Sequence, residues 1–196
     1  MKTLVVSLGK VFFRIRGLTP IPFYIACFFY SRIELIFFLT GFLLIGLGEC
    51  LRIFSVGYLG VLSRKTNYAD AEKLVMSGPY RFVRNPIYLG NMLIYLGFTV
   101  LSNVFFPLFS LMTFVFFMFV YYSIALYEET VLMLQFDLRY QRYMLSVPRF
   151  FPLFRTNLQI DSAQEFDPAM ALQSEKTTLI VLVLAFSAMV IKNYTL

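Results

Sequence analysis

The sequence predicts an all-α protein, a multi-pass integral membrane helical bundle of about five transmembrane helices with cytoplasmic cofactor-binding segments. The first observation is composition: 59% of the 196 residues are hydrophobic and only 14% are charged, against roughly 25% charged residues in an ordinary soluble domain. The second is that the apolar residues form runs close to the ~20 residues needed to cross a bilayer. This argues against a soluble globular domain, and the length leaves room for one compact membrane domain.

The N-terminal part of the chain carries two predicted spans behind a surface segment. Residues 1–17 alternate apolar and basic positions, and we expect them to lie along the membrane interface. Leu18–Tyr30 is a short apolar run that opens with two prolines, so it forms either a short span or a re-entrant or interfacial segment. Leu35–Phe54 is long enough to span, and Glu49 and Arg52 near its far end are expected to reach the interface.

A helical hairpin is predicted in the middle of the chain. Val104–Tyr127 is an uncharged run of 24 residues, enough to cross a hydrocarbon core of about 30 Å. Ile87–Leu101 precedes it, and only the polar pair Ser102 and Asn103 separates the two runs. We therefore expect two antiparallel spans joined by a tight turn.

These elements divide the chain into four parts. Residues 1–17 form the interfacial segment, and residues 18–155 form the membrane core. Residues 156–176 are polar and are predicted to be a linker. Residues 177–196 are predicted to be a C-terminal transmembrane helix, because Thr177–Ile191 is strongly apolar.

The basic residues predict the orientation in the membrane. With these spans, only Arg32 and Lys192 of the 17 Lys and Arg residues fall on one side, and all the others fall on the opposite side. Since cytoplasmic loops carry the excess of Lys and Arg, the N-terminus and both long loops are predicted to be cytoplasmic and the C-terminus external. The membrane would be the inner membrane in a bacterium or the endoplasmic reticulum in a eukaryote. The net charge of +6 is then explained without a nucleic-acid partner.

The absence of histidine excludes several kinds of active site. The chain contains no His, so it holds no Ser-His or Cys-His triad, no imidazole base and no His-ligated metal. No metal site is predicted.

A first polar segment precedes the predicted hairpin. Gly78 and the proline after it mark a turn, while Pro86 suits the first position of a helix with Asn85 as its N-cap. A helix N-terminus beside Arg81 and Arg84 would favour an anion at the membrane surface. The alternative is that both arginines only follow the positive-inside rule and Asn85 only caps the helix.

A second polar segment follows the hairpin and begins with the acidic pair Glu128 and Glu129. Adjacent carboxylates at a membrane boundary are costly unless they are hydrated or matched to a cation. The alternative to a site is two solvated interfacial acids. Four residues after the pair share one face of a helix predicted to continue out of the bilayer: Leu132, Phe136, Tyr140 and Tyr143.

The two segments together form one long ordered pattern. It comprises Leu74, Val75, Gly78, Pro79, Tyr80, Arg81, Arg84, Pro86, Tyr88, Gly90, Glu128, Glu129, Phe136, Tyr140, Tyr143, Val147, Pro148, Arg149, Phe150 and Pro152. This pattern resembles the signature of the isoprenylcysteine carboxyl methyltransferase and phospholipid methyltransferase group of integral membrane enzymes. The resemblance covers roughly Gly46 to Pro152.

Three positions depart from that signature. Asn85 stands where the group usually has His, Asp137 replaces a Gly, and Ser146 lies where the prenylcysteine enzymes tend to be basic. These departures weaken the case for a prenylcysteine acceptor more than the case for the cofactor site.

The resemblance implies that S-adenosyl-L-methionine binds at the cytoplasmic ends of the core spans and that a lipophilic small-molecule, lipid or prenylated acceptor enters from the bilayer. The residues that it implies for catalysis are Arg84, Glu128, Glu129 and Arg149. Those that it implies for cofactor binding are Leu74, Val75, Gly78, Tyr80, Arg81, Asn85, Pro86, Tyr88, Glu129, Tyr140 and Tyr143.

The acceptor itself stays open. A carboxylate, as in isoprenylcysteine, needs an orienting cation such as Arg84 or Arg149, whereas an ammonium on a lipid headgroup must lose a proton to Glu128 or Glu129. Two other functions compete with methyl transfer. Sterol and steroid reductases share a similar Arg-His-Pro-x-Tyr stretch and use NADPH, and Asn85 in place of His leaves room for a non-catalytic membrane scaffold. The oligomeric state is not predicted.

Overall fold

The computed structural model describes residues 2–60, 74–152 and 164–195, and no strand occurs in this part of the chain. The prediction of an all-α protein is therefore confirmed. The helices are α1 (Lys2–Ile15), α2 (Ile21–Tyr30), α3 (Leu35–Leu59), the 3₁₀ helix η3 (Gly78–Arg81), α4 (Pro86–Ser102), α5 (Leu108–Ser146) and α6 (Pro168–Thr195).

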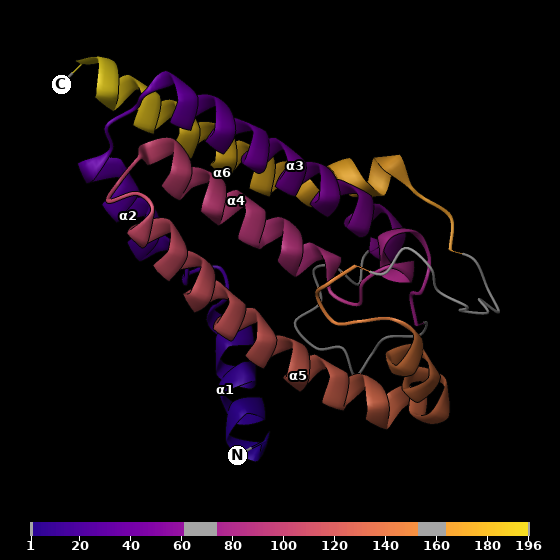
Figure 1. The fold of residues 1–196 in the computed structure, drawn as a ribbon. Coiled ribbons are helices and arrows are strands. Elements are labelled where there is room, and N and C mark those ends of the chain that lie inside the picture. Colours follow the sequence, from indigo (N-terminus) through magenta and orange to yellow (C-terminus); the bar gives the residue numbers. More distant parts are fainter. Residues whose placement is uncertain (1, 61–73, 153–163, 196) are drawn as a thin grey trace.

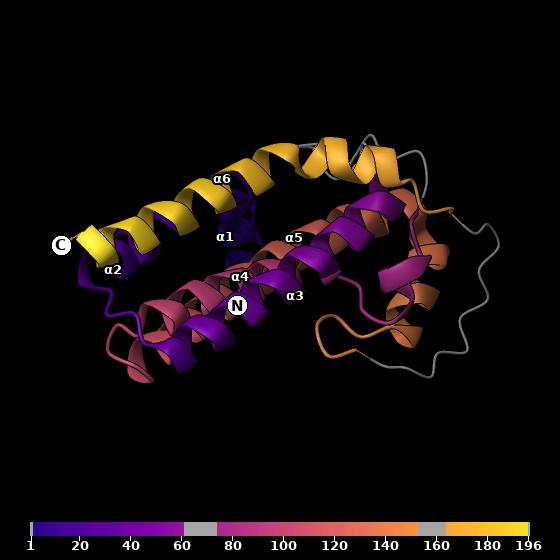
Figure 2. The same ribbon diagram turned by 90° about the horizontal axis from the view of Figure 1, so that it is seen from above.

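Helices α3 and α4 form the centre of the bundle (Figure 1). Helix α5 packs on α4, α1 packs on α5, and α6 contacts α3 and α2. Figure 2 shows the same arrangement from above, with α6 along one side of the central pair. The end of α3, η3, the start of α4, the end of α5 and the start of α6 all lie at one end of the molecule. Both polar segments of the sequence therefore meet at this end.

Two pairs of glycines let α3 and α4 approach closely. A Cβ added at Gly48 would lie 2.6 Å from the carbonyl oxygen of Gly90, and one added at Gly41 would lie 2.5 Å from that of Gly97. Contact through small residues is the usual way in which helices pack in membranes. We call this close contact between α3 and α4 the glycine seam. It fixes how the side chains of the two helices lie at the end of the molecule where the polar segments meet.

Helix α1 crosses α5 at another close contact. A Cβ at Gly9 would lie 2.0 Å from the Ser123 carbonyl oxygen, and Phe12 meets Phe119 edge to face at 6.1 Å. The opposite face of α1 is an exposed apolar stripe at helical spacing, formed by Leu4, Leu8, Val11 and Ile15. That stripe suits the predicted location of residues 1–17 at the membrane interface, which stays a prediction.

Three helices of the described part, α3, α5 and α6, are long and apolar enough to cross a membrane. Helices α2 and α4 are shorter, with 10 and 17 residues, so the count of five spans stays a prediction. Helix α5 begins at Leu108, because the chain turns over the preceding residues, rather than at Val104 as predicted.

Helix α6 begins earlier than predicted, at Pro168 instead of residue 177. The Asp167 carboxylate accepts a hydrogen bond of 2.9 Å from the Met170 N–H, and so caps the helix. The linker was predicted to be residues 156–176. Its part from Pro168 onward is therefore helical, while residues 156–163 lie outside the described part of the chain. Hydropathy missed this start because the first turns of α6 are polar.

The helix predicted to continue out of the bilayer is interrupted. Within α5, Asp137 has φ 40° and ψ −120°, which breaks the helical path. The residues beyond the break still pack inward: Tyr140 and Tyr143 are buried in a cluster with Leu74 and Met76, against which Leu132 and Phe136 lie. The shared face was predicted correctly, but the continuous helix was not.

Candidate functional site

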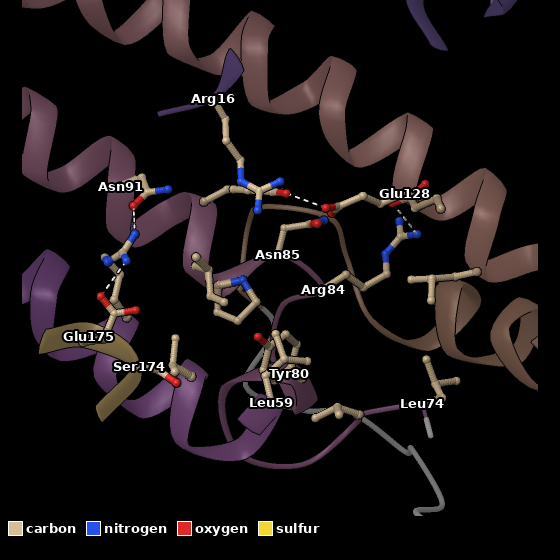
Figure 3. Close-up of a pocket in the computed structure, with 18 of the residues that line it drawn as sticks. Arg16, Leu59, Leu74, Tyr80, Arg84, Asn85, Asn91, Glu128, Ser174 and Glu175 are labelled. Carbon is tan, nitrogen blue, oxygen red and sulfur yellow. Dashed lines mark hydrogen bonds and ion pairs between the residues drawn. The ribbon is translucent and has the colours of Figure 1, made fainter. Parts of the chain in front are cut away.

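A cavity of about 490 Å³ lies at the end of the bundle where the two polar segments meet (Figure 3). Its walls come from α3, the η3 segment, α4, α5 and α6, and Arg16 reaches it from the turn after α1. Ligand pockets for small molecules range from roughly 300 to 1,000 Å³. The volume therefore suits a cofactor or an acceptor headgroup.

Most of the residues predicted for the site line this cavity. They are Leu74, Val75, Tyr80, Arg84, Asn85, Pro86, Tyr88, Glu128, Glu129, Tyr140 and Tyr143. The fold thus brings both polar segments to one place, as their common signature implied.

Three predicted residues lie outside the lining. Gly78 has φ 58°, and a Cβ there would lie 2.3 Å from the ring of Tyr58. The turn and the close packing therefore explain why a glycine occupies this position. The side chain of Arg81 is exposed to solvent. Arg149 does not line the cavity but contacts Glu129, which does.

The Glu129 carboxylate is held by two arginines. Arg84 Nη1 lies 2.8 Å from Glu129 Oε1. Arg149 donates from Nε to Oε1 at 2.8 Å and from Nη2 to Oε2 at 2.6 Å. This two-pronged geometry gives strong, oriented, charge-assisted hydrogen bonds, and it raises the pKa of Arg149 in spite of the opposing effect of burial. The Glu129 carboxylate is therefore fixed in position by both arginines.

The neighbouring carboxylate has a different partner. Tyr88 donates a hydrogen bond of 2.6 Å from its hydroxyl to Glu128 Oε1, and its ring stacks on Tyr121 at 4.7 Å. Glu128 and Glu129 are each only 7% exposed. The alternative of two solvated interfacial acids is therefore wrong, because the first polar segment covers both side chains.

The loop after α5 is tied to the start of α4. The Arg84 N–H donates to the Pro148 carbonyl at 2.9 Å, and Asn85 Nδ2 donates to the Arg149 carbonyl at 3.2 Å. Asn85 occupies the N-cap position of α4, but its side chain makes no capping hydrogen bond. The predicted N-cap position is confirmed, but the Asn85 side chain does not cap the helix, because its amide joins the two polar segments instead.

A second charged group lies on the α3 and α6 side of the cavity. Arg52 Nη2 forms an ion pair of 2.6 Å with Glu175 Oε2, another of its nitrogens donates to Asn91, and Glu49 Oε2 lies 3.5 Å from its Nε. Glu49 is 7% exposed and Glu175 is 4% exposed. Both side chains are turned into the bundle, because α6 supplies Glu175 as a partner for Arg52; their place relative to the membrane interface stays a prediction.

Several lining residues were not found from the sequence: Arg16, Arg52, Val56, Leu59, Ile87, Asn91, Leu132, Ser174, Glu175, Thr177 and Thr178. The sequence did contain one signal for the pairing of Arg52 with Glu175. An ionisable residue within an apolar helix, such as Arg52, usually faces a partner in the bundle interior, and Glu175 stands two residues before the apolar run of α6.

The lining combines opposite charges with apolar wall. Three arginines and three glutamates face the same space as Leu74, Val75 and Val56. Such a site suits a ligand that carries both a cationic and an anionic group beside an apolar part. In the described residues no group of three or more acidic or cysteine side chains is placed to hold a metal ion.

Comparison with known families identifies the family. A family model described as phospholipid methyltransferase matches residues 36–139, which is more than half of the chain. The matched stretch contains Arg84, Glu128 and Glu129 but ends before Arg149, and it leaves out α1 and α6. No curated protein and no solved structure matches the chain.

Proposed function

The chain belongs to the phospholipid methyltransferase family, and from this premise we propose that it transfers a methyl group from S-adenosyl-L-methionine to a lipophilic acceptor at the cytoplasmic face of the membrane. Membership implies methyltransferase activity on lipid-like substrates, and the three long apolar helices agree with an integral membrane protein. The observation that carries the finer proposal is the cavity in which Glu129 is clamped by two arginines beside Glu128.

The residues present fit the cofactor. S-Adenosylmethionine carries an ammonium, a carboxylate and a sulfonium. Arg84 Nε is buried and makes no hydrogen bond within the described residues, so it offers a donor for the carboxylate. The two glutamates offer acceptors for the ammonium, and Leu74 and Val75 offer apolar contact. Bound there, the cofactor would supply an electrophilic methyl group for in-line displacement.

The contribution of the chain to the reaction is alignment and proton control. Holding the reacting groups in line within the cavity lowers the barrier, and displacement of water by the two bound substrates would lower it further. Arg149 reaches Glu129 but does not line the cavity, so we assign it a positioning role rather than contact with substrate. Glu128, which is hydrogen-bonded by a tyrosine, is the better placed of the two acids to accept a proton from an ammonium acceptor.

Both acceptor classes stay within the proposal. An isoprenylcysteine-like carboxylate would be oriented by Arg84 and needs no base, whereas an amine headgroup would need Glu128. The fold supports the proposed orientation, because the two basic residues assigned outside contact helix ends remote from the cavity. Lys192 Nζ donates to the Phe29 carbonyl near the end of α2 at 3.1 Å. The Arg32 N–H donates to the Ser102 carbonyl at the end of α4 at 2.9 Å.

The test is binding of S-adenosylmethionine and of NADPH to the detergent-purified chain by calorimetry. We expect S-adenosylmethionine to bind and NADPH not to bind. Glu129→Gln and Arg84→Ala should each weaken the affinity for S-adenosylmethionine at least about tenfold, since each removes a charge-assisted contact. Glu165→Gln, on an exposed glutamate outside the cavity, is the matched control and should change nothing.

Other results would replace the proposal. Binding of NADPH in place of S-adenosylmethionine would support a membrane reductase. Binding of neither to folded protein would support a scaffold. If S-adenosylmethionine binds, transfer of its labelled methyl group to phospholipid vesicles or to a prenylated cysteine peptide identifies the acceptor class.

A further inference from the structure

We propose that Arg16 is the binding residue for an anionic group, a phosphate or a carboxylate, on the lipophilic acceptor. This inference rests on the proposed function, because it assigns part of the same cavity to the acceptor. Arg16 lies outside the stretch that matches the family, so nothing in the family resemblance assigns it a role.

The first argument is charge pairing among the arginines that line the cavity. Arg52 forms an ion pair with Glu175, and Arg84 forms one with Glu129. Arg16, the third, has no ion pair with any residue in the described ranges 2–60, 74–152 and 164–195. A partly buried guanidinium facing a cavity without a carboxylate partner attracts an anion, since buried charges are stable only when they are paired.

The second argument is that Arg16 is held in place by rigid contacts. Its guanidinium carbon lies 4.1 Å from the ring centroid of Phe13, and its Nη1 donates to the Phe13 carbonyl at 3.2 Å. Phe13 is 4% exposed and belongs to the core cluster that contains Tyr88 and Tyr121. One guanidinium donor is used in this way, and the others can serve a ligand, since the group carries five N–H donors.

The third argument is the direction from which Arg16 enters. In Figure 3 Arg16 reaches the cavity from the top, whereas Leu59 and Leu74 line the lower side. Arg16 follows the exposed apolar stripe of α1, and its neighbours Ile15 and Leu18 are 40% and 63% exposed. The cation therefore stands where apolar surface meets the cavity. An amphiphile with its hydrocarbon along α1 would bring its anionic group to this position.

The experiment compares octyl phosphate, octanoate and octanol as probes, titrated by calorimetry into the full chain in neutral detergent. Both anionic probes should bind more tightly than octanol, and the preference between them identifies the anion class. Arg16→Gln should weaken binding of the preferred anion about tenfold or more while octanol is unchanged. Arg14→Gln is the matched control, because Arg14 is exposed on α1 and does not line the cavity, and it should change affinity less than about twofold.

Further measurements keep the inference open to refutation. Arg16→Lys keeps the charge and should retain most of the affinity. In the unsubstituted chain, raising NaCl from about 50 mM to about 500 mM should weaken binding of the anionic probe but not of octanol, a readout that needs no variant to fold. Equal affinity of the Arg16→Gln and Arg14→Gln proteins for the anion, or no preference for anions over octanol, would overturn the assignment.

The same samples are titrated with S-adenosylmethionine, which separates the two proposals. Cofactor binding without a role for Arg16 in anion binding would refute the acceptor subsite alone. Loss of anion binding in Arg16→Gln without any cofactor binding would refute the proposed function and leave the anion site standing.

Discussion

Arg149 holds the Glu129 carboxylate without lining the cavity, with Nε and Nη2 on its two oxygens at 2.8 and 2.6 Å. The glutamate belongs to α5, and the arginine lies in the loop after it, 20 residues later. Because the Arg149 backbone carbonyl also accepts from Asn85, one residue connects the acidic pair, the returning loop and the start of α4.

This relationship predicts that Arg149→Ala weakens binding of S-adenosylmethionine without abolishing it. Removal of the clamp frees Glu129 to change rotamer, so we expect an affinity loss of about three- to tenfold, smaller than that of Glu129→Gln. Arg149→Lys should recover only part of it, since an amine cannot make two parallel hydrogen bonds. Arg142→Ala, on an exposed arginine of the same region, is the control in the calorimetric comparison. Identical affinity of Arg149→Ala and Arg142→Ala would show that the clamp is dispensable.

The break in α5 predicts a stabilising substitution. Asp137 is exposed and adopts φ 40°, ψ −120°, a region that costs residues with a Cβ about 1–2 kcal/mol and that glycine adopts freely. Asp137→Gly should therefore raise the thermal unfolding midpoint of the chain in detergent. Asp137→Ala removes the same charge but keeps the Cβ, so it should give no such gain. A gain of equal size in both proteins would assign the effect to charge instead of backbone strain.

The glycine seam between α3 and α4 predicts position-dependent sensitivity. Gly48→Ala and Gly90→Ala each place a methyl group within 2.7 Å of a carbonyl oxygen on the facing helix. The helices must then separate, which costs about 1–3 kcal/mol. Gly46→Ala, on the same helix with nothing within 4 Å, should not lower the unfolding temperature, since Ala forms helices more readily than Gly. If Gly46→Ala destabilised the chain as much as Gly48→Ala, the loss could not be assigned to the close contact between α3 and α4.

The pair of Arg52 and Glu175 predicts non-additive stability. Glu175→Leu leaves the Arg52 guanidinium without its 2.6 Å partner, and loss of one member of a buried pair costs about 3–5 kcal/mol. Replacing both, as Arg52→Met with Glu175→Leu, should cost less than the sum of the two single losses, because neither member of this pair is then left facing the other's empty place. Glu49 loses its contact with Arg52 in the single Arg52→Met and in the double variant alike. Thermal unfolding of the two single variants and the double variant gives the stabilities for a double-mutant cycle. Additive losses would mean that the two side chains stabilise the fold independently.

The helical class and the place of the two polar segments were predictable from local sequence. Apolar runs and their lengths predicted α3, α5 and α6, and the ordered residues from Leu74 to Pro152 predicted that Arg84, Glu128 and Glu129 share a site. Local signals were less reliable at helix ends. Hydropathy placed the start of α6 too late, because the capped first turns of that helix are polar.

The sequence by itself thus determined that the chain is helical and apolar, and which polar residues belong together in its signature. Only the tertiary structure decided which helix faces which, and so turned Arg52 inward to Glu175, brought Arg16 to the cavity and placed Arg149 against Glu129. The physical reason is that helices apolar on all sides carry almost no periodic signal for their contact faces. Close packing at the glycine seam and at Gly9, together with the partners available to each buried charge, selects those faces.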